Sequence, residues 1–468
     1  MHGHRAGAAL RTTVMQKFAS NPPFQRTTVS GPATGALAGP SAATAGVRDS
    51  IPVLPMFLAV AAPIQILGWM FFTAGELRLA TILSAVAVIV GSLWLLERAS
   101  RARVRISVKS PLFRSMVFFV AIWIVCTTVV VVTGVRLDAD KFVPQTAILL
   151  SSVATFFALA AAARHASPNR ALMIVCHSIA IIGSVSVVLD AVGITNFETY
   201  GTRYFGFLGD GVSWALTFPL ILYFTTGRFY YAGAVAVPVL LTASRGPALL
   251  IACAMVLLLA FSKNRRFQYA LTLMVLGLAV AYQSDQASEL LGRFTSTSLT
   301  DNDRVLTSLN GIKVFLMSPI WGSGYNALEY YYPDVGNARL LGEFSVATST
   351  AVQMLSEGGI LLFLAYVAFV IFATAAAVRI LRSSDQESGA LMTGLAVWLI
   401  AMLWSNQSAA WFLVGSFLTP LVLGASGLVA AFDVRRREQA WLESAMMRPK
   451  SGTDLFVTRR QPPAIRLP

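Results

Sequence analysis

An arginine interrupts a long apolar run in "LTASRGPALLIACAMVLLLAF", residues 241–261. Arginine stays charged at any relevant pH and binds phosphate through two parallel hydrogen bonds. Of the neighbours of Arg245, Ser244 is a helix-capping residue type, Gly246 would let the backbone turn, and Pro247 suits a helix start. A helix N-terminus beside an arginine favours a bound anion. Arg245 is therefore either an anion clamp facing an outer cavity or an arginine that reaches the lipid headgroups.

A second arginine falls in the long polar stretch 284–350. Residues 300–319 predict an amphipathic helix there, because apolar side chains recur at helical spacing and a proline marks the end. Gly322 and Gly324 would shape the turn that follows. Arg304 would lie in the first turn, where backbone amides also point outward. It is either an anion ligand or a surface arginine paired with a neighbouring aspartate.

Further candidates lie in "GTRYFGFLGDG", before a predicted span. Arg203 and Asp210 are candidates for binding an anion or a sugar, and an interfacial anchor is the other interpretation of Arg203. Arg293, in the long polar stretch, is a further candidate ligand. The four histidines lie in the N-terminal tail or toward the cytoplasm. A histidine-ligated zinc site on the outer face is thus excluded, and any general base there must be a carboxylate.

The composition is that of a membrane protein. The chain has 468 residues, of which 56% are hydrophobic and 12% charged, about half the charged share of a typical soluble protein. Much of the net charge of +14 lies in short loops between apolar runs and in the two tails, where positive charge sets membrane orientation. We therefore expect a polytopic membrane protein and no nucleic-acid partner.

About twelve apolar runs approach or exceed the length that crosses a bilayer, so the predicted fold class is all-α. The predicted spans are 54–73, 78–96, 113–134, 144–163, 171–190, 211–226, 229–243, 247–262, 268–283, 351–378, 389–404 and 409–431.

The basic loops predict the orientation of these spans. Loops rich in Lys and Arg stay in the cytoplasm, and three strongly basic ones are "ERASRARVRISVKS", "KNRR" and "DVRRRE". All three face the cytoplasm when both termini are inside. Segments 136–141, 190–211 and 284–350 then face out, and Arg245 lies at the outer end of its span.

Three parts of the chain are distinguished. Residues 1–50 are rich in Gly, Ala, Ser, Thr and Pro, lack the apolar core of a secretory signal, and predict a disordered cytoplasmic tail. Residues 51–435 predict the transmembrane domain, with one large extracytoplasmic loop at 284–350. Residues 436–468 predict a second cytoplasmic tail with a short surface helix near Trp441.

Four stretches within residues 195–375 resemble the O-antigen ligase and polymerase family of bacterial envelope transferases. They are "RYFGFLGD" before a span, "TASRGP" between two spans, "DRVLTSLNGIKVFLMSPIWGSGYNALE" in the outer loop and "TSTAVQMLSEGGILLFL" opening the next span. Their order and spacing carry the resemblance, because each piece alone is weak.

The resemblance implies a GT-C-like membrane glycosyltransferase at the outer face of the bacterial cytoplasmic membrane. Its substrate would be a glycan linked to undecaprenyl diphosphate, with no separate cofactor; chain-length regulator and export proteins would be partners. The family's diphosphate-binding arginines map onto Arg245 and Arg304, with Ser244 beside the substrate. A metal is then unnecessary, since arginine stabilises the departing diphosphate. Glu343 or Glu357 would accept the acceptor's proton, or Glu357 would only brace the loop through backbone hydrogen bonds.

One residue departs from the ligase pattern. Ligases carry a histidine nine residues before the glutamate of E-x-G, and Thr348 stands there in this chain. We keep Thr348 as a substrate-binding candidate and expect an exopolysaccharide polymerase rather than a ligase that transfers glycan to lipid A core. A transporter or flippase is the main alternative of another class, and a scaffold is a third. Spans nearly free of charge and polar content gathered in one outer loop favour a transferase.

Overall fold

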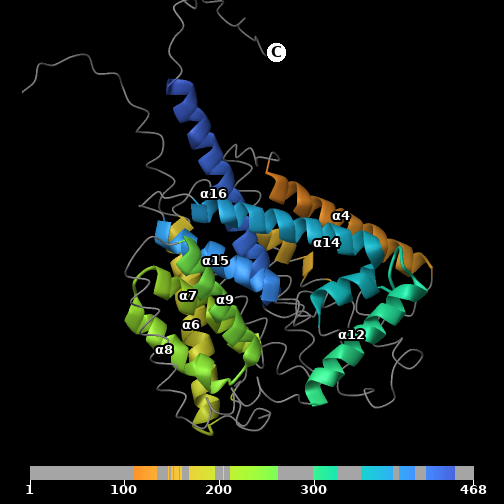
Figure 1. Cartoon of the computed structure of the whole chain (residues 1–468), viewed down its shortest axis with the longest axis horizontal. Coiled ribbons are helices and arrows are strands. Elements are labelled where there is room, and N and C mark those ends of the chain that lie inside the picture. The colour runs from red at the N-terminus through yellow and green to blue at the C-terminus, as the bar shows by residue number, and fades with distance from the viewer. Residues whose placement is uncertain are drawn as a thin grey trace, which may run out of the picture. The chain divides into compact units, whose positions relative to one another are not determined.

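The fold is described from a computed structural model (Figure 1). All of the described residues belong to the second of two compact units, Asp49–Pro468, the first being Met1–Arg48. The predicted spans 54–73, 78–96 and 268–283 lie outside the described residues. The residues described are 110–133, 146, 149–150, 152–157, 159–160, 168–194, 204, 211–261, 299–324, 349–382, 389–405 and 418–447.

Within these ranges the chain forms helices and no strands, which confirms the predicted all-α membrane fold. Three helices, α4, α14 and α16, are long and apolar enough to cross a membrane, and several shorter apolar helices accompany them. The helices are α4 (Pro111–Val132), α6 (Pro168–Ala191), α7 (Gly211–Thr225), α8 (Phe229–Leu241), α9 (Arg245–Phe261), α12 (Leu299–Met317), α14 (Thr350–Arg382), α15 (Gly389–Ser405) and α16 (Leu418–Met447).

Most of the described helices coincide with predicted elements. The bounds of α4, α6, α7, α8, α9 and α15 lie within about three residues of the predicted spans. The amphipathic helix is α12, which ends two residues before Pro319. The predicted span 144–163 is described only in part, as helical residues between 146 and 160.

The last helix is longer than the span predicted to end at 431. The short helix predicted near Trp441 lies within it, because α16 continues without interruption to Met447. The sequence "DVRRREQAWLESAMM" contains no Gly or Pro and is rich in good helix formers, so nothing in it stops the helix. Residues 436–447 therefore continue the last helix beyond its apolar part.

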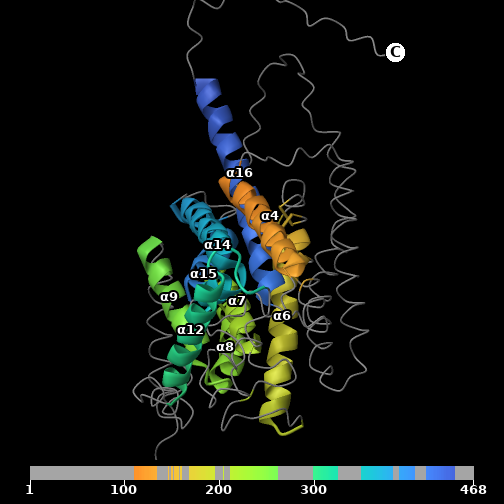
Figure 2. The same cartoon turned by 90° about the vertical axis from the view of Figure 1, so that its right-hand side faces the viewer.

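Two helices form the centre of the packing. Nearly every residue of α7 is buried, as is nearly every residue between Leu391 and Leu403 of α15, as expected for helices that are apolar on all sides. A hydrogen bond of 3.0 Å from Trp398 Nε1 to Thr217 Oγ1 joins them. Helices α6, α8 and α9 pack on α7, while α9, α14 and α16 pack on α15 (Figures 1 and 2).

Helix α14 is broken at Gly359, whose φ of 66° and ψ of −170° are not helical. The predicted single span 351–378 is therefore two helices, Thr350–Gly358 and Ile360–Arg382. Residues 360–378 carry no charge and measure about 28 Å at 1.5 Å per residue, close to the roughly 30 Å of a bilayer's hydrocarbon core. The break thus lies near one membrane surface, and the helix Thr350–Gly358 lies beyond the span.

Candidate functional site

The structure describes only some of the predicted site residues. Five of them lie outside the described residues: Arg203, Asp210, Arg293, Glu343 and Thr348. Arg245 and Arg304 are described as parts of their helices, without their side chains. Ser244 is half-buried and Glu357 is buried.

Arg245 is the first residue of α9, directly after the short turn from α8. The chain reverses through Ala243, which has a positive φ of 44°. The Ala243 amide donates to the Leu240 carbonyl at 2.9 Å, and the Ala248 amide donates to the Ser244 carbonyl at 3.4 Å. The backbone of Arg245 therefore stands at a helix N-terminus, where unpaired amides favour an anion.

The role predicted for Gly246 was wrong. It lies within α9 and does not make the turn, because the positive φ falls on Ala243. A Cβ at Gly246 would overlap the indole ring of Trp214 on α7. Glycine is needed there for close packing between α9 and α7, and a sequence motif alone does not separate that need from a turn.

The first motif meets the second in the structure. The Tyr204 amide donates a hydrogen bond of 3.3 Å to the carbonyl of Leu241, the last residue of α8. Tyr204 also packs, half-buried, against the apolar core. Tyr204, the described residue of "RYFGFLGD", therefore reaches the same turn that leads into Arg245, although the two residues are about forty positions apart.

Arg304 is placed differently from its prediction. Helix α12 begins at Leu299, so Arg304 lies in its second turn rather than its first. Its amide is not among the first four, which lack partners within a helix. Any contribution of Arg304 to anion binding therefore rests on its side chain rather than on the helix N-terminus.

Helix α12 packs closely against the first part of α14 (Figure 2). A Cβ at Gly311 would press on Val352, so glycine sets the short separation of the two helices. Many of the buried residues on these helices are polar. The buried polar residues described there are Thr307, Asn310, Thr350, Gln353, Ser356 and Glu357.

The loop after α12 supplies the hydrogen bonds that the break in α14 requires. A broken helix leaves carbonyls and amides without helical partners. The Ser356 carbonyl accepts from the Ser323 amide at 2.9 Å and from its hydroxyl at 3.0 Å. The Glu357 carbonyl accepts from the Gly324 amide at 2.9 Å, and the Ile360 amide donates to the Pro319 carbonyl at 2.9 Å. Each bond contributes about 1 kcal/mol net.

Two glycines allow this docking. Gly322 and Gly359 have φ values of 77° and 66°, a region that side-chain-bearing residues rarely adopt. A Cβ on Gly322 would overlap the Glu357 carbonyl, and one on Gly359 would overlap the Ile320 carbonyl. The predicted turn at Gly322 and Gly324 is confirmed, and its partner is the break in α14.

The side chain of Glu357 is held inside the protein. The residue is 3% exposed, and Gln353 Nε2, one helical turn earlier, donates to Glu357 Oε2 at 3.3 Å. Glu357 lines a small pocket between α14 and α4, with room for about one water molecule. The other lining residues are Trp123, Cys126, Thr127, Gly324, Gly358 and Leu362.

Helix α4 is the part of this site that the sequence did not reveal. Cys126 Sγ lies 3.5 Å from the Gly358 carbonyl, at the break itself. Nothing in an apolar span such as "VAIWIVCTTVVVV" marks three of its residues as walls of a polar pocket. Gln353, by contrast, has a sequence signal, because it precedes Glu357 by four positions and so shares its helix face.

The described elements form two groups. The turn leading into Arg245 packs through α9 on α7 and α15, whereas Glu357 belongs to the group of α4, α12 and α14. Helix α15 connects the groups, since it packs on both α9 and α14.

Comparison with known proteins identifies a region that includes both the turn before Arg245 and Glu357. Residues 231–367 match a family model described as O-antigen ligase. The match runs from α8 into α14 beyond its break, and it includes the Arg245 turn, α12 and Gly359. No curated protein matches the chain. The family match covers three of the four sequence stretches and confirms the family resemblance, whereas "RYFGFLGD" lies before the matched residues.

Proposed function

We propose that this membrane enzyme of the O-antigen ligase and polymerase family polymerises glycan repeat units carried on undecaprenyl diphosphate. The family match supports an enzyme of polysaccharide biosynthesis. The observation that carries the proposal of a diphosphate-linked donor is the position of Arg245 at the N-terminus of α9, inside the matched region. Arginine side chain and helix amides together provide the donors that a diphosphate needs.

The proposed reaction is a glycosyl transfer. A hydroxyl of the acceptor attacks the anomeric carbon of the donor glycan, and the bond from that carbon to the diphosphate oxygen breaks. Undecaprenyl diphosphate leaves with the bonding electrons, and the hydroxyl proton passes to a base. Arg245, assisted by the side chain of Arg304, stabilises the negative charge that grows on the leaving group. This mechanism requires no metal.

Glu343 and Glu357 are the candidate bases. Burial of Glu357 and its hydrogen bond with Gln353 favour a supporting role, because a base must reach the proton that it removes. We therefore assign the proton transfer to Glu343 first. Glu357 holds the loop through its main-chain carbonyl, which accepts from Gly324.

Polymerisation is favoured over ligation by Thr348. Threonine has no group that titrates near neutral pH, so it cannot replace the histidine of the ligase pattern as a proton acceptor.

In the proposed orientation both termini are cytoplasmic and the reaction occurs outside the inner membrane. The substrate-binding candidates Arg203, Asp210, Ser244 and Arg293 would contact the lipid-linked glycan on that side, and chain-length regulator and export proteins would take up the product.

Sizing the lipid-linked glycans of a deletion strain tests the proposal. Without a polymerase, single repeats accumulate on the carrier and no high-molecular-weight polysaccharide is secreted. Without a ligase, long chains accumulate on the carrier. Without a flippase, single repeats stay on the cytoplasmic side, out of reach of glycosidase added outside. Single repeats that the glycosidase removes support the polymerase. Long chains on the carrier, or single repeats that the glycosidase cannot reach, contradict it.

A further inference from the structure

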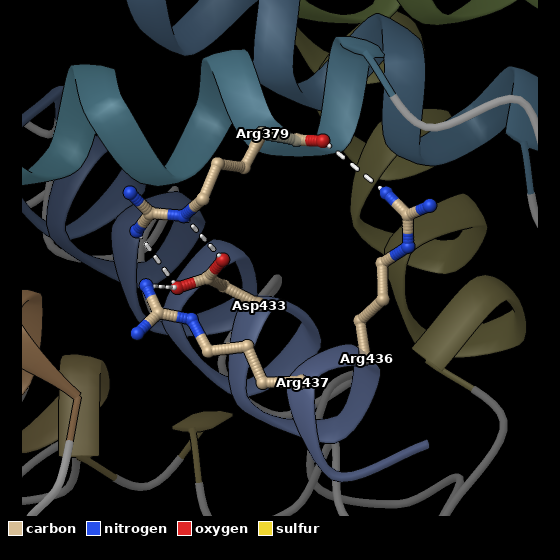
Figure 3. Close-up of polar contacts among 4 residues, drawn as sticks. All are labelled: Arg379, Asp433, Arg436 and Arg437. Atoms are coloured by element: carbon tan, nitrogen blue, oxygen red, sulfur yellow. Dashed lines mark hydrogen bonds and ion pairs between the residues drawn. The ribbon is translucent and has the colours of Figure 1, made fainter. Parts of the chain in front are cut away.

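A cluster of arginines joins the C-terminal end of α14 to the middle of α16, at the opposite end of α14 from the break at Gly359 (Figure 3). Asp433 of α16 accepts from Arg379 Nε at 2.7 Å and from Arg379 Nη2 at 2.9 Å. It also accepts from Arg437 Nη2 at 2.9 Å. Arg436 Nη1 donates to the main-chain carbonyl of Arg379 at 3.2 Å. One carboxylate thus fixes two guanidinium groups, and a third binds the backbone beside them.

The cluster lies at a membrane surface. In α14 the first charge after the break is Arg379, at the end of the uncharged stretch 360–378. In α16 the first charge is Asp433, after uncharged residues 418–432. Because Arg379 and Asp433 form an ion pair, both apolar segments end at one level. Charged residues at that level stand among lipid headgroups.

The cluster carries more positive charge than its own carboxylates neutralise. Five arginines, at 379, 382 and 435–437, stand against Asp433, Glu438 and Glu443 in residues 379–382 of α14 and 433–447 of α16, an excess of two positive charges. Arg382, Arg435 and Arg437 are exposed, whereas Asp433 is buried. The one carboxylate at the centre is turned inward, and the guanidinium groups remain at the surface.

We infer that this arginine cluster binds the phosphate group of an anionic phospholipid. A guanidinium has five N–H donors, and Asp433 engages only two from Arg379 and one from Arg437. The remaining donors belong to groups whose positions are already fixed, so little side-chain freedom is lost when a phosphate binds. Each basic residue near a membrane surface strengthens attraction to anionic lipid about fivefold. The inference does not depend on the proposed glycosyl transfer.

The test is a lipid titration of the purified full-length chain, followed by native mass spectrometry. Phosphatidylglycerol and phosphatidylcholine with the same acyl chains are compared. We expect the wild type to bind phosphatidylglycerol at least about fivefold more tightly. The double variant Arg382→Gln/Arg435→Gln, which leaves the Asp433 network intact, should lose this preference. The control Arg114→Gln/Arg228→Gln removes the same charge elsewhere and should keep it.

A second variant separates an organised site from general attraction. Asp433→Asn raises the net positive charge but releases Arg379 and Arg437. General attraction predicts tighter binding of phosphatidylglycerol, whereas the proposed site predicts weaker binding. Equal affinity for the two lipids, an unchanged Arg382→Gln/Arg435→Gln variant, or tighter binding by Asp433→Asn would overturn the inference. So would displacement of the lipid by millimolar inorganic phosphate, which would identify a site for free phosphate.

Discussion

At the scale of single residues, Arg245 and Glu357 belong to the same matched region but to different surroundings. Arg245 begins a helix beside a turn that the Tyr204 amide also reaches. Glu357 is enclosed between α4 and α14 and hydrogen-bonded to Gln353. The first position suits contact with a charged substrate, and the second suits support of the surrounding backbone.

Replacement of Arg245 tests whether its geometry matters beyond its charge. Lysine keeps the charge but loses the planar pair of donors. We expect Arg245→Lys and Arg245→Ala both to abolish polymer formation while the protein reaches the membrane at near-normal levels. Arg228→Lys, in the exposed turn between α7 and α8, should retain activity. Full activity of Arg245→Lys would instead show that this residue only reaches the lipid headgroups.

Replacement of Glu357 tests whether its side chain acts as the general base or the residue only supports the loop. Glu357→Gln keeps the shape and the main-chain carbonyl that accepts from Gly324, but it cannot accept a proton. A positioned general base contributes about 10²- to 10⁴-fold to a rate. We expect Glu357→Gln to stay within about tenfold of the wild-type rate and Glu343→Gln to lose far more. A loss of a hundredfold or more in Glu357→Gln alone would assign the base to Glu357.

At the scale of elements, the break in α14 is the feature that organises the candidate site. The loop 318–324 binds both sides of the break, so the two motifs "SPIWGSG" and "SEGGI" form one structural unit. Their separation in sequence hides this relation. Each motif supplies hydrogen-bond partners that the backbone of the other requires.

Gly359→Ala tests that unit. Alanine at φ 66° and ψ −170° is strained, and its Cβ would also meet the Ile320 carbonyl. We expect a stability loss of about 2 kcal/mol or more and, in detergent, faster proteolysis within the loop after α12. Gly233→Ala is the matched control, since a Cβ there meets nothing within 4 Å. Equal protease resistance of both variants would show that the loop does not depend on the break.

Hydropathy predicted where helices lie but not how they are interrupted. The bounds of α7 and α8 follow from composition, because each helix is an apolar run that is bounded by turn residues. The break at Gly359 was missed because a glycine does not interrupt a run of high hydropathy. Its positive φ depends on the loop that docks against it, and hydropathy does not show that loop. The extension of α16 was missed because a charged sequence after an apolar span resembles a polar tail. The contribution of α4 to the pocket depends on tertiary packing alone.

At the scale of the whole molecule, the orientation of the helices decides where the reaction occurs. In a cysteine-free background, a single cysteine at Asp138 or Thr297 should react with an impermeant thiol reagent in intact cells. One at Arg103 or Ser384 should not, because basic loops remain in the cytoplasm. Labelling at Arg103 from outside would reverse the orientation and move the proposed site to the cytoplasm.

Reconstitution of the purified full-length chain with single lipid-linked repeats from the deletion strain tests the proposed polymerisation most directly. With EDTA present throughout, the account predicts a ladder of lipid-linked chains and release of undecaprenyl diphosphate. Arg245→Lys should give neither. A ladder that requires added Mg²⁺ or Mn²⁺ would contradict the metal-independent mechanism. Repeats that cross the membrane of the vesicles without joining would contradict the polymerase itself.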